Sequence, residues 1–166
     1  MFKVGDTVVY SVHGLCEIDD ISEKTYGKVT RTYYVMHPLE DPKLTINNPV
    51  DSDQAIMLAV MEKEEAEEIL QSFLEPGITW IEDARLRYRN YSKLVNDGDR
   101  KEICKVISTL MRKKEEATID KKKMYEQDRL LLSNTQNIMF KELAMSLDTS
   151  FEEISKRVSS LISPHA

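Results

Sequence analysis

The feature that most limits the possible folds of this chain is a change in residue pattern near Pro49. Before this point, β-branched and aromatic residues occur in short runs separated by glycine, proline and charged residues, which is typical of strands joined by turns. After it, apolar residues recur three or four positions apart, the spacing of one face of an α-helix. The pattern predicts an α+β chain in which a β module precedes an all-helical domain.

The N-terminal part contains four predicted strands within about fifty residues, which favours a small barrel of the SH3 or Tudor type. The apolar run Ala55–Val60 follows and is ambiguous between helix and strand. We therefore predict a β-rich domain over residues 1–54 and a helical domain over residues 55–166. The predicted strands are Val4–Tyr10, Leu15–Ile21, Thr30–Met36 and Lys43–Ile46, with breaks at Gly14, Lys24–Gly27 and Pro38–Pro42.

The C-terminal part reads as four to five helices. Thr79 and Glu82 have the spacing of a capping box, which predicts a helix that begins with Trp80 and ends near Val95. Asp99 is a second predicted N-cap. The complete set of predicted helices is 62–74, 80–95, one starting near Asp99, one from about Asp120 to Leu147, and one from the capping box Thr149–Glu152 to about Ile162.

Composition excludes several classes of function. No apolar run approaches the roughly 18 residues of a membrane span, and no export signal is recognisable at the N-terminus. Cys16 and Cys104 are isolated, which favours reduced thiols and the cytoplasm. His13, His37 and His165 match no metal-binding spacing, and no catalytic motif occurs, so we expect neither an enzyme nor a cofactor.

Charge is distributed unevenly. The chain has a net charge of −6, but residues 80–124 hold 13 Lys and Arg against 8 Asp and Glu. A basic segment can bind phosphate whatever the net charge of the protein, although a negative net charge weakens non-specific binding to DNA. Any DNA contact is therefore expected to be weak alone and to need a second anchor. A solvated basic surface explains the same charges, and it is the preferred interpretation for Lys113-Lys114 and Lys121–Lys123.

Trp80, the only tryptophan, has two interpretations. At a helix tip, an indole can insert into a distorted base step, as apolar wedges in the minor groove do. Alternatively, Trp80 packs between two helices and has a structural role. Arg85, Arg89 and Lys93 are four residues apart and share a helix face that can follow a phosphate strand, whereas Arg87 lies on the other side.

The chain resembles the CarD family of bacterial transcription regulators, and its opening is similar to the polymerase-interacting module of the transcription-repair coupling factor. The resemblance rests on the joint order of several short motifs along most of the chain. They are Phe2–Tyr10 with His13-Gly14, Tyr33–Val35, Leu44–Ile46 before Pro49-Val50, Trp80, Arg87–Arg89, Gly98-Asp99, Ile103–Leu110, Arg112 and Glu142–Ala144.

The resemblance implies a function and two sites. The β module would bind the RNA polymerase β subunit through an exposed strand edge. The helical domain would contact promoter DNA at the upstream edge of the open bubble, with little sequence preference. Polymerase-binding positions carried over from the family are Lys24, Leu44, Thr45, Ile46 and Asn47; DNA-binding positions are Trp80, Arg87 and Arg89.

Two hypotheses follow. In the first, a monomer anchored on polymerase inserts Trp80 at the melted junction and slows bubble collapse, and tethering makes a weak basic surface sufficient. The DNA-contacting set is then Trp80, Arg85, Arg87, Arg89 and Lys93. In the alternative, the protein is an adaptor that bridges polymerase or another partner without touching DNA.

Overall fold

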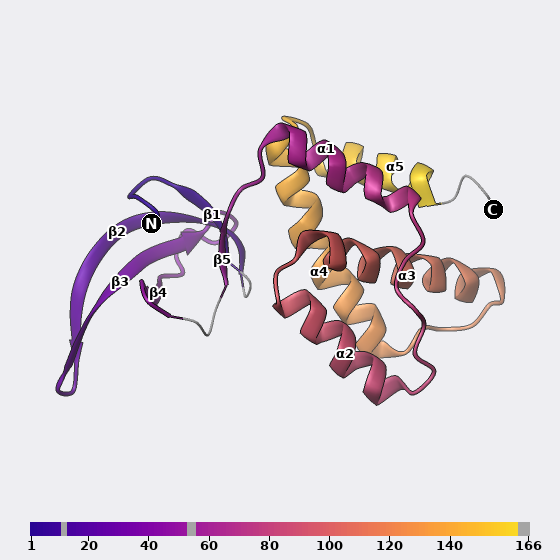
Figure 1. Ribbon diagram of the computed structural model, residues 1–166, viewed down its shortest axis with the longest axis horizontal. Helices are drawn as coiled ribbons and strands as arrows, with labels where there is room; N and C mark the ends of the chain where they lie inside the picture. The colour runs from indigo at the N-terminus through magenta and orange to yellow at the C-terminus, as the bar shows by residue number, and fades with distance from the viewer. Residues whose placement is uncertain (11–12, 53–55, 163–166) are drawn as a thin grey trace. The chain divides into compact units, whose positions relative to one another are not determined.

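The computed structural model describes residues 1–10, 13–52 and 56–162. The chain forms two compact units, Met1–Val60 and Met61–Ala166 (Figure 1). Within the described residues, the first unit is a five-stranded sheet and the second contains five α-helices, which is the predicted α+β class with the β module first. The predicted boundary at 54/55 falls among residues outside the described part, and the two units divide six residues later, between Val60 and Met61.

The sheet is antiparallel, with strand order β4-β3-β2-β1-β5. The apolar run that is ambiguous in sequence, Ala55–Val60, contains the strand Met57–Ala59. This strand pairs with the first strand of the chain, Thr7–Tyr10. Asn48 Nδ2 on one edge strand lies 3.4 Å from Met57 Sδ on the other, so the two edges approach each other as in a small barrel. The strands are β1 (Thr7–Tyr10), β2 (Gly14–Tyr26), β3 (Val29–Pro38), β4 (Ile46–Pro49) and β5 (Met57–Ala59), and the buried core is Val8, Tyr10, Cys16, Ile18, Tyr34 and Met36.

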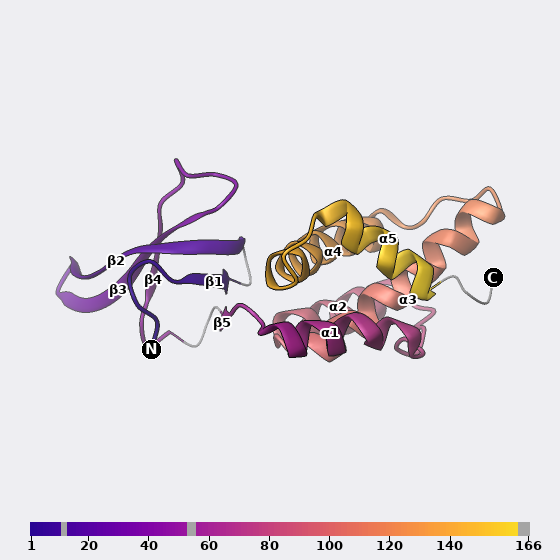
Figure 2. The ribbon, with the colours of Figure 1, turned by 90° about the horizontal axis from the view of Figure 1, so that it is seen from above.

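The β2–β3 hairpin is longer than the sequence indicates (Figures 1 and 2). The predicted break at Lys24–Gly27 is wrong, because β2 continues to Tyr26 and pairs with Val29 across a two-residue turn. Gly27 opens that turn with φ 64°, a left-handed conformation that glycine adopts without steric cost. The outer part of the hairpin is largely exposed, so it lacks the alternating apolar pattern that marks a strand in sequence.

Both cysteines are free and buried. Burial raises the pKa of the Cys16 thiol to about 11 and that of Cys104 to about 12. Because the thiolate is the reactive form, we expect the native protein to resist a thiol reagent such as DTNB at pH 8. Both thiols should react in denaturant, as measured by absorbance. Rapid reaction of one thiol without denaturant would show that its surroundings are open to solvent.

The helical unit is organised around its fourth helix. The helices are α1 (Lys63–Gln71), the 3-10 turn η1 (Ser72–Leu74), α2 (Ala84–Asn96), α3 (Arg100–Ile119), α4 (Glu126–Ser146) and α5 (Phe151–Ile162). Helix α4 contacts each of the other four α-helices (Figures 1 and 2). Its core neighbours include Phe73, Tyr91, Ile107, Leu110 and Ile154, all at most 2% exposed. An α-helix enclosed in this way buries residues on more than one face.

The predicted start of the second helix is wrong. Helix α2 begins at Ala84, and its N-cap is Asp83, whose side chain accepts hydrogen bonds from the amides of Arg85 and Leu86. Thr79 is not the cap, because no helix begins until Ala84; its carbonyl accepts a hydrogen bond from the Tyr91 hydroxyl. Trp80 therefore precedes the helix instead of occupying its first position.

Two other helix starts differ from prediction. Helix α4 begins six residues later than Asp120, because α3 ends there in a left-handed Lys121 (φ 55°). Lys121 and Lys122 donate amide hydrogen bonds to the carbonyls of Thr118 and Ala117, which is a Schellman motif formed without glycine. Helix α5 is capped by Ser150, whose hydroxyl accepts from the Glu153 amide, so the cap lies one residue beyond Thr149. The predicted cap Asp99 is confirmed.

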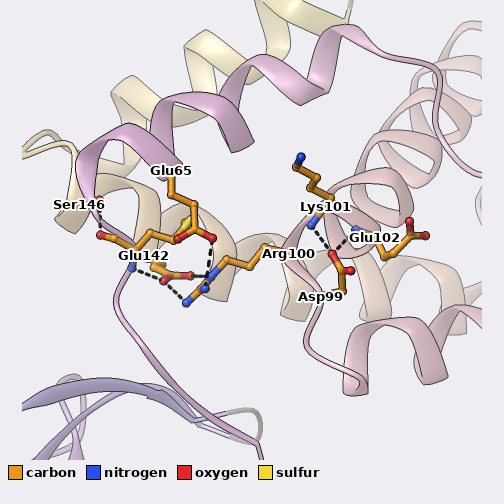
Figure 3. A network of polar contacts seen from close by, with 8 residues as sticks. Glu65, Asp99, Arg100, Lys101, Glu102, Glu142 and Ser146 are labelled. Carbon is orange, nitrogen blue, oxygen red and sulfur yellow. Dashed lines mark hydrogen bonds and ion pairs between the residues drawn. The ribbon is translucent and has the colours of Figure 1, made fainter.

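A buried polar network fixes the beginning of the helical unit (Figure 3). Glu142, 2% exposed, receives two hydrogen bonds from the Arg100 guanidinium and one from the Met61 amide, at 2.7–3.0 Å. The Ser146 hydroxyl donates to the Met61 carbonyl at 2.6 Å, and Glu65 lies 3.7 Å from Arg100. Helix α4 therefore holds both backbone polar groups of Met61, where the helical unit starts.

Candidate functional site

Residues 75–83 connect η1 to α2 and run against α3 without regular secondary structure. The Thr109 hydroxyl accepts a hydrogen bond from the Ile78 amide at 2.8 Å and lies 3.2 Å from the Ile78 carbonyl, to which it can donate. A Cβ on Gly77 would lie 2.0 Å from Thr109 Oγ1, so the approach to α3 requires glycine. Together with the bond from Tyr91 to Thr79, these contacts hold the segment that carries Trp80.

Trp80 is half-buried and packs against the helical core. Its ring lies edge-to-face with Tyr91 at 6.5 Å between centroids. Two cations also contact it: the Arg87 guanidinium carbon lies 4.2 Å from the ring centroid, and Lys113 Nζ lies 4.7 Å from it. Both are within the range of cation–π attraction. The site is therefore a partly accessible indole held between α2 and α3 with positive charge directly against its ring.

Arg87 does not have the exposed position that a phosphate-binding residue needs. It is 1% exposed, and its Nε and Nη2 donate to the two carboxylate oxygens of Asp128 at 3.0 and 2.6 Å. Its Nη1 donates to the carbonyls of Ile81 and Glu82 at 2.7 and 3.3 Å. The hydrogen bonds to Asp128 raise the pKa of Arg87, which keeps it charged. The polar atoms of Arg87 are thus bound inside the protein, and its predicted contact with DNA stays a prediction.

The other predicted basic residues of α2 are exposed. Arg85, Arg89 and Lys93 follow one another at four-residue intervals on the solvent side of the helix. Successive residues in an α-helix are about 100° apart, so Arg85 and Arg89 point nearly opposite to Arg87. The structure therefore separates this basic face from the side of α2 that contacts Trp80, as the spacing of the arginines predicts.

Sequence reasoning missed two residues of the site. Asp128 lies on α4, 41 positions from Arg87, and no local pattern links them. The sequence favours a solvated surface for Lys113, yet this residue contacts Trp80 and also pairs with Glu116 at 3.3 Å. Its position four residues after Thr109 on the buried side of α3 was the available indication. Lys121–Lys123 are exposed in the turn between α3 and α4.

The predicted polymerase-binding residues lie on two different strands. Ile46 and Asn47 belong to β4, which is an edge strand, as expected. Leu44 and Thr45 precede this strand and are exposed, so the predicted strand Lys43–Ile46 is placed about three residues early. Lys24 is half-buried on β2, and β3 separates it from β4. The structure thus brings Ile46 and Asn47 to one edge and leaves Lys24 on the hairpin.

Among the residues that the structure describes, strand pairing creates one group of possible metal ligands. Glu17, Asp19 and His37 have ligand atoms within 4.8 Å of one another, because pairing of β2 with β3 brings His37 beside the two acids. His37 Nδ1 lies 2.7 Å from Asp19 Oδ2, and its Nε2 lies 3.7 Å from Glu17 Oε2. The hydrogen bond with Asp19 raises the pKa of His37, which favours an imidazolium between two carboxylates. This ion pair accounts for the cluster without a metal. His165 lies outside the described residues.

A β unit with an edge strand, joined to a helical unit with a cation-flanked tryptophan and a separate basic face, defines a two-part binding protein. Among the described helices, none is both long and apolar enough to cross a membrane. Residues 2–60 match the CarD-like/TRCF RID domain, and residues 68–159 match the CarD C-terminal domain. The chain belongs to the CarD family. These matches support a transcription regulator that interacts with RNA polymerase.

Proposed function

We propose that the protein binds the RNA polymerase β subunit through β4 and contacts promoter DNA with Trp80 and the exposed face of α2. An edge strand presents main-chain groups to which a partner strand can add. Ile46 and Asn47 lie on that edge, with Leu44 and Thr45 just before it; Lys24 would act from the hairpin. Polymerase binding then raises the local concentration of DNA around a weak basic surface.

The observation that carries the DNA proposal is the environment of Trp80. The ring is partly accessible, and Lys113 places a positive charge against it. An indole held in this way can enter a base step at the edge of a melted bubble, and the adjacent cation favours the flanking phosphate. Inserted at that junction, Trp80 would oppose reannealing and lengthen the life of the open complex.

The lifetime of the promoter open complex tests this proposal. Complexes formed with cognate polymerase are challenged with competitor in the presence of no factor, wild type, or Trp80→Ala. We expect wild type to lengthen the lifetime and Trp80→Ala to remove most of that gain. Lys156→Ala, a substitution on α5 away from the site, serves as the control. Equal lifetimes for wild type and a folded Trp80→Ala would exclude the wedge.

The exposed basic face of α2 is expected to act through phosphates alone. The triple variant Arg85→Ala, Arg89→Ala and Lys93→Ala should weaken binding of the polymerase-bound factor to DNA similarly for all promoter sequences. Each lost phosphate contact lowers the slope of log affinity against log salt by about 1. Titration of salt against affinity measures this slope. A promoter-dependent loss, or an unchanged slope, would contradict phosphate contact by this face.

The adaptor hypothesis has one observation in its favour, which is the packing of Trp80 against Tyr91 and the helical core. It predicts that Trp80→Ala lowers stability but leaves the effect on transcription unchanged per folded molecule. Fluorescence separates the two hypotheses because Trp80 is the only tryptophan. In the free protein, a red-shifted emission that acrylamide quenches shows an accessible Trp80 ring and favours the wedge.

A further inference from the structure

We infer that Arg87 and Asp128 form a clamp that fixes the position of Trp80, so that Arg87 acts on DNA through Trp80 and does not touch DNA itself. Arg87 is thereby a positioning residue. This inference rests on the proposed contact between Trp80 and DNA. It differs from the family-based expectation, in which Arg87 belongs to the phosphate-binding set.

The geometry of the clamp uses all three nitrogens of the Arg87 side chain. Nε and Nη2 hold the Asp128 carboxylate of α4 at two points, which fixes the orientation of the guanidinium plane. Nη1 reaches the carbonyls of Ile81 and Glu82, the two residues that follow Trp80. The centre of the same guanidinium lies 4.2 Å from the Trp80 ring centroid. One side chain therefore fixes both the backbone after Trp80 and the indole itself.

Charge and burial make direct phosphate binding by Arg87 unfavourable. Asp128 is 3% exposed and Arg87 1%, so the two charges neutralise each other inside the helical unit. A phosphate could bind Arg87 only by displacing Asp128, and an unpaired buried carboxylate is costly. Lys113 is half-buried beside the ring, and the exposed cations Arg85, Arg89 and Lys93 lie on the opposite face of α2.

A clamp of this kind is useful because residues 75–83 have no helix or strand to stiffen them. A side chain that enters a stacked duplex must be held in place, since ordering it during insertion would reduce the binding free energy. The Tyr91 hydroxyl, bonded to the Thr79 carbonyl at 2.8 Å, holds the residue before Trp80 in the same way. Trp80 is thus fixed from both of its flanks.

Two conservative substitutions distinguish the clamp from a phosphate contact because the two roles predict opposite results. Asp128→Asn removes a negative charge and releases Arg87, so a phosphate-binding Arg87 would bind DNA at least as well. A clamp would instead loosen, and the effect of the factor would fall. Arg87→Lys keeps the charge but loses the planar fork. It should preserve a phosphate contact and damage a clamp.

The experiment uses the full chain with cognate polymerase and promoter DNA. Asp128→Asn, Arg87→Lys and Tyr91→Phe are compared with two matched controls on the exposed surface, Asp97→Asn and Arg129→Lys. Acrylamide quenching of Trp80 emission reports its position in the free protein, and open-complex lifetime reports function at equal folded fractions. Tyr91→Phe tests the other flank without a change of charge, and it remains informative if Arg87→Lys does not fold.

The clamp predicts that Asp128→Asn, Arg87→Lys and Tyr91→Phe increase quenching of Trp80. It also predicts that each of these variants loses most of the lifetime gain, as Trp80→Ala does. The two controls should behave as wild type. Unchanged quenching and lifetime with Asp128→Asn, or a longer lifetime, would overturn the clamp. An unchanged lifetime with Trp80→Ala would contradict the proposed contact of Trp80 with DNA. A change in quenching would then still show that the clamp positions Trp80, but this position would have no effect on DNA.

Discussion

Glu142→Ala is expected to destabilise the helical unit by about 3 kcal/mol, the lower end of the range for removing one partner of a buried ion pair. The change leaves the Arg100 guanidinium, 14% exposed, without its main carboxylate and the Met61 amide without its acceptor. In a domain of about 100 residues each kcal/mol lowers Tm by roughly 4–8 °C. Calorimetry or urea titration followed by circular dichroism measures the loss.

Two variants show whether this loss comes from the network in Figure 3. Glu65→Ala removes a half-exposed carboxylate 3.7 Å from Arg100 and should cost less than about 1 kcal/mol. The double variant Glu142→Leu with Arg100→Met removes both charges and should recover part of the stability, because an apolar pair requires no charge to be desolvated. A Glu142→Ala effect no larger than that of Glu65→Ala would contradict the role assigned to Glu142.

Gly77→Ala is the second substitution with a large expected effect, about 1–3 kcal/mol for overpacking a closed contact. The new Cβ would lie 2.0 Å from Thr109 Oγ1 and 3.1 Å from the Lys105 carbonyl oxygen, so the segment must move away from α3. That movement breaks the hydrogen bonds between Ile78 and Thr109 and displaces Trp80. Urea titration measures the stability, and the Trp80 emission spectrum reports the displacement.

A double-mutant cycle isolates the close contact. Thr109→Ala removes the hydroxyl nearest to the new Cβ, so Gly77→Ala should cost less in that background than in the wild type. Glu75→Ala, an exposed change in the same segment, is the control and should leave the emission of Trp80 unchanged. Additive effects of Gly77→Ala and Thr109→Ala would mean that the chain accommodates a Cβ at position 77 without moving from α3.

The sequence predicted the order of the elements well because their patterns are local. Alternating β-branched residues before Pro49 and apolar spacing of three to four after it depend only on neighbouring residues. The cap at Asp99 was predicted for the same reason and is confirmed. The predicted break at Lys24–Gly27 failed because the hairpin there is exposed, and pairing with β3 maintains the strand without an apolar face.

The candidate site was predicted less well because its defining contacts join distant parts of the chain. The sequence predicted Thr79 as the cap near Trp80, whereas the structure uses Asp83, and contacts from Tyr91 and Thr109 hold the segment before it. The helical spacing did place Arg87 away from Arg85, but it carried no information about what faces Arg87.

The sequence alone predicts the α+β class and a β module before a helical domain. It also shows the resemblance to the CarD family and predicts a basic face on the second helix. Tertiary structure alone decided that Trp80 lies in a segment without helix or strand, that Lys113 contacts its ring, and that Arg87 is buried against Asp128. The physical reason is that periodicity and capping act over a few residues. A buried ion pair 41 residues apart exists only when packing brings α2 and α4 together.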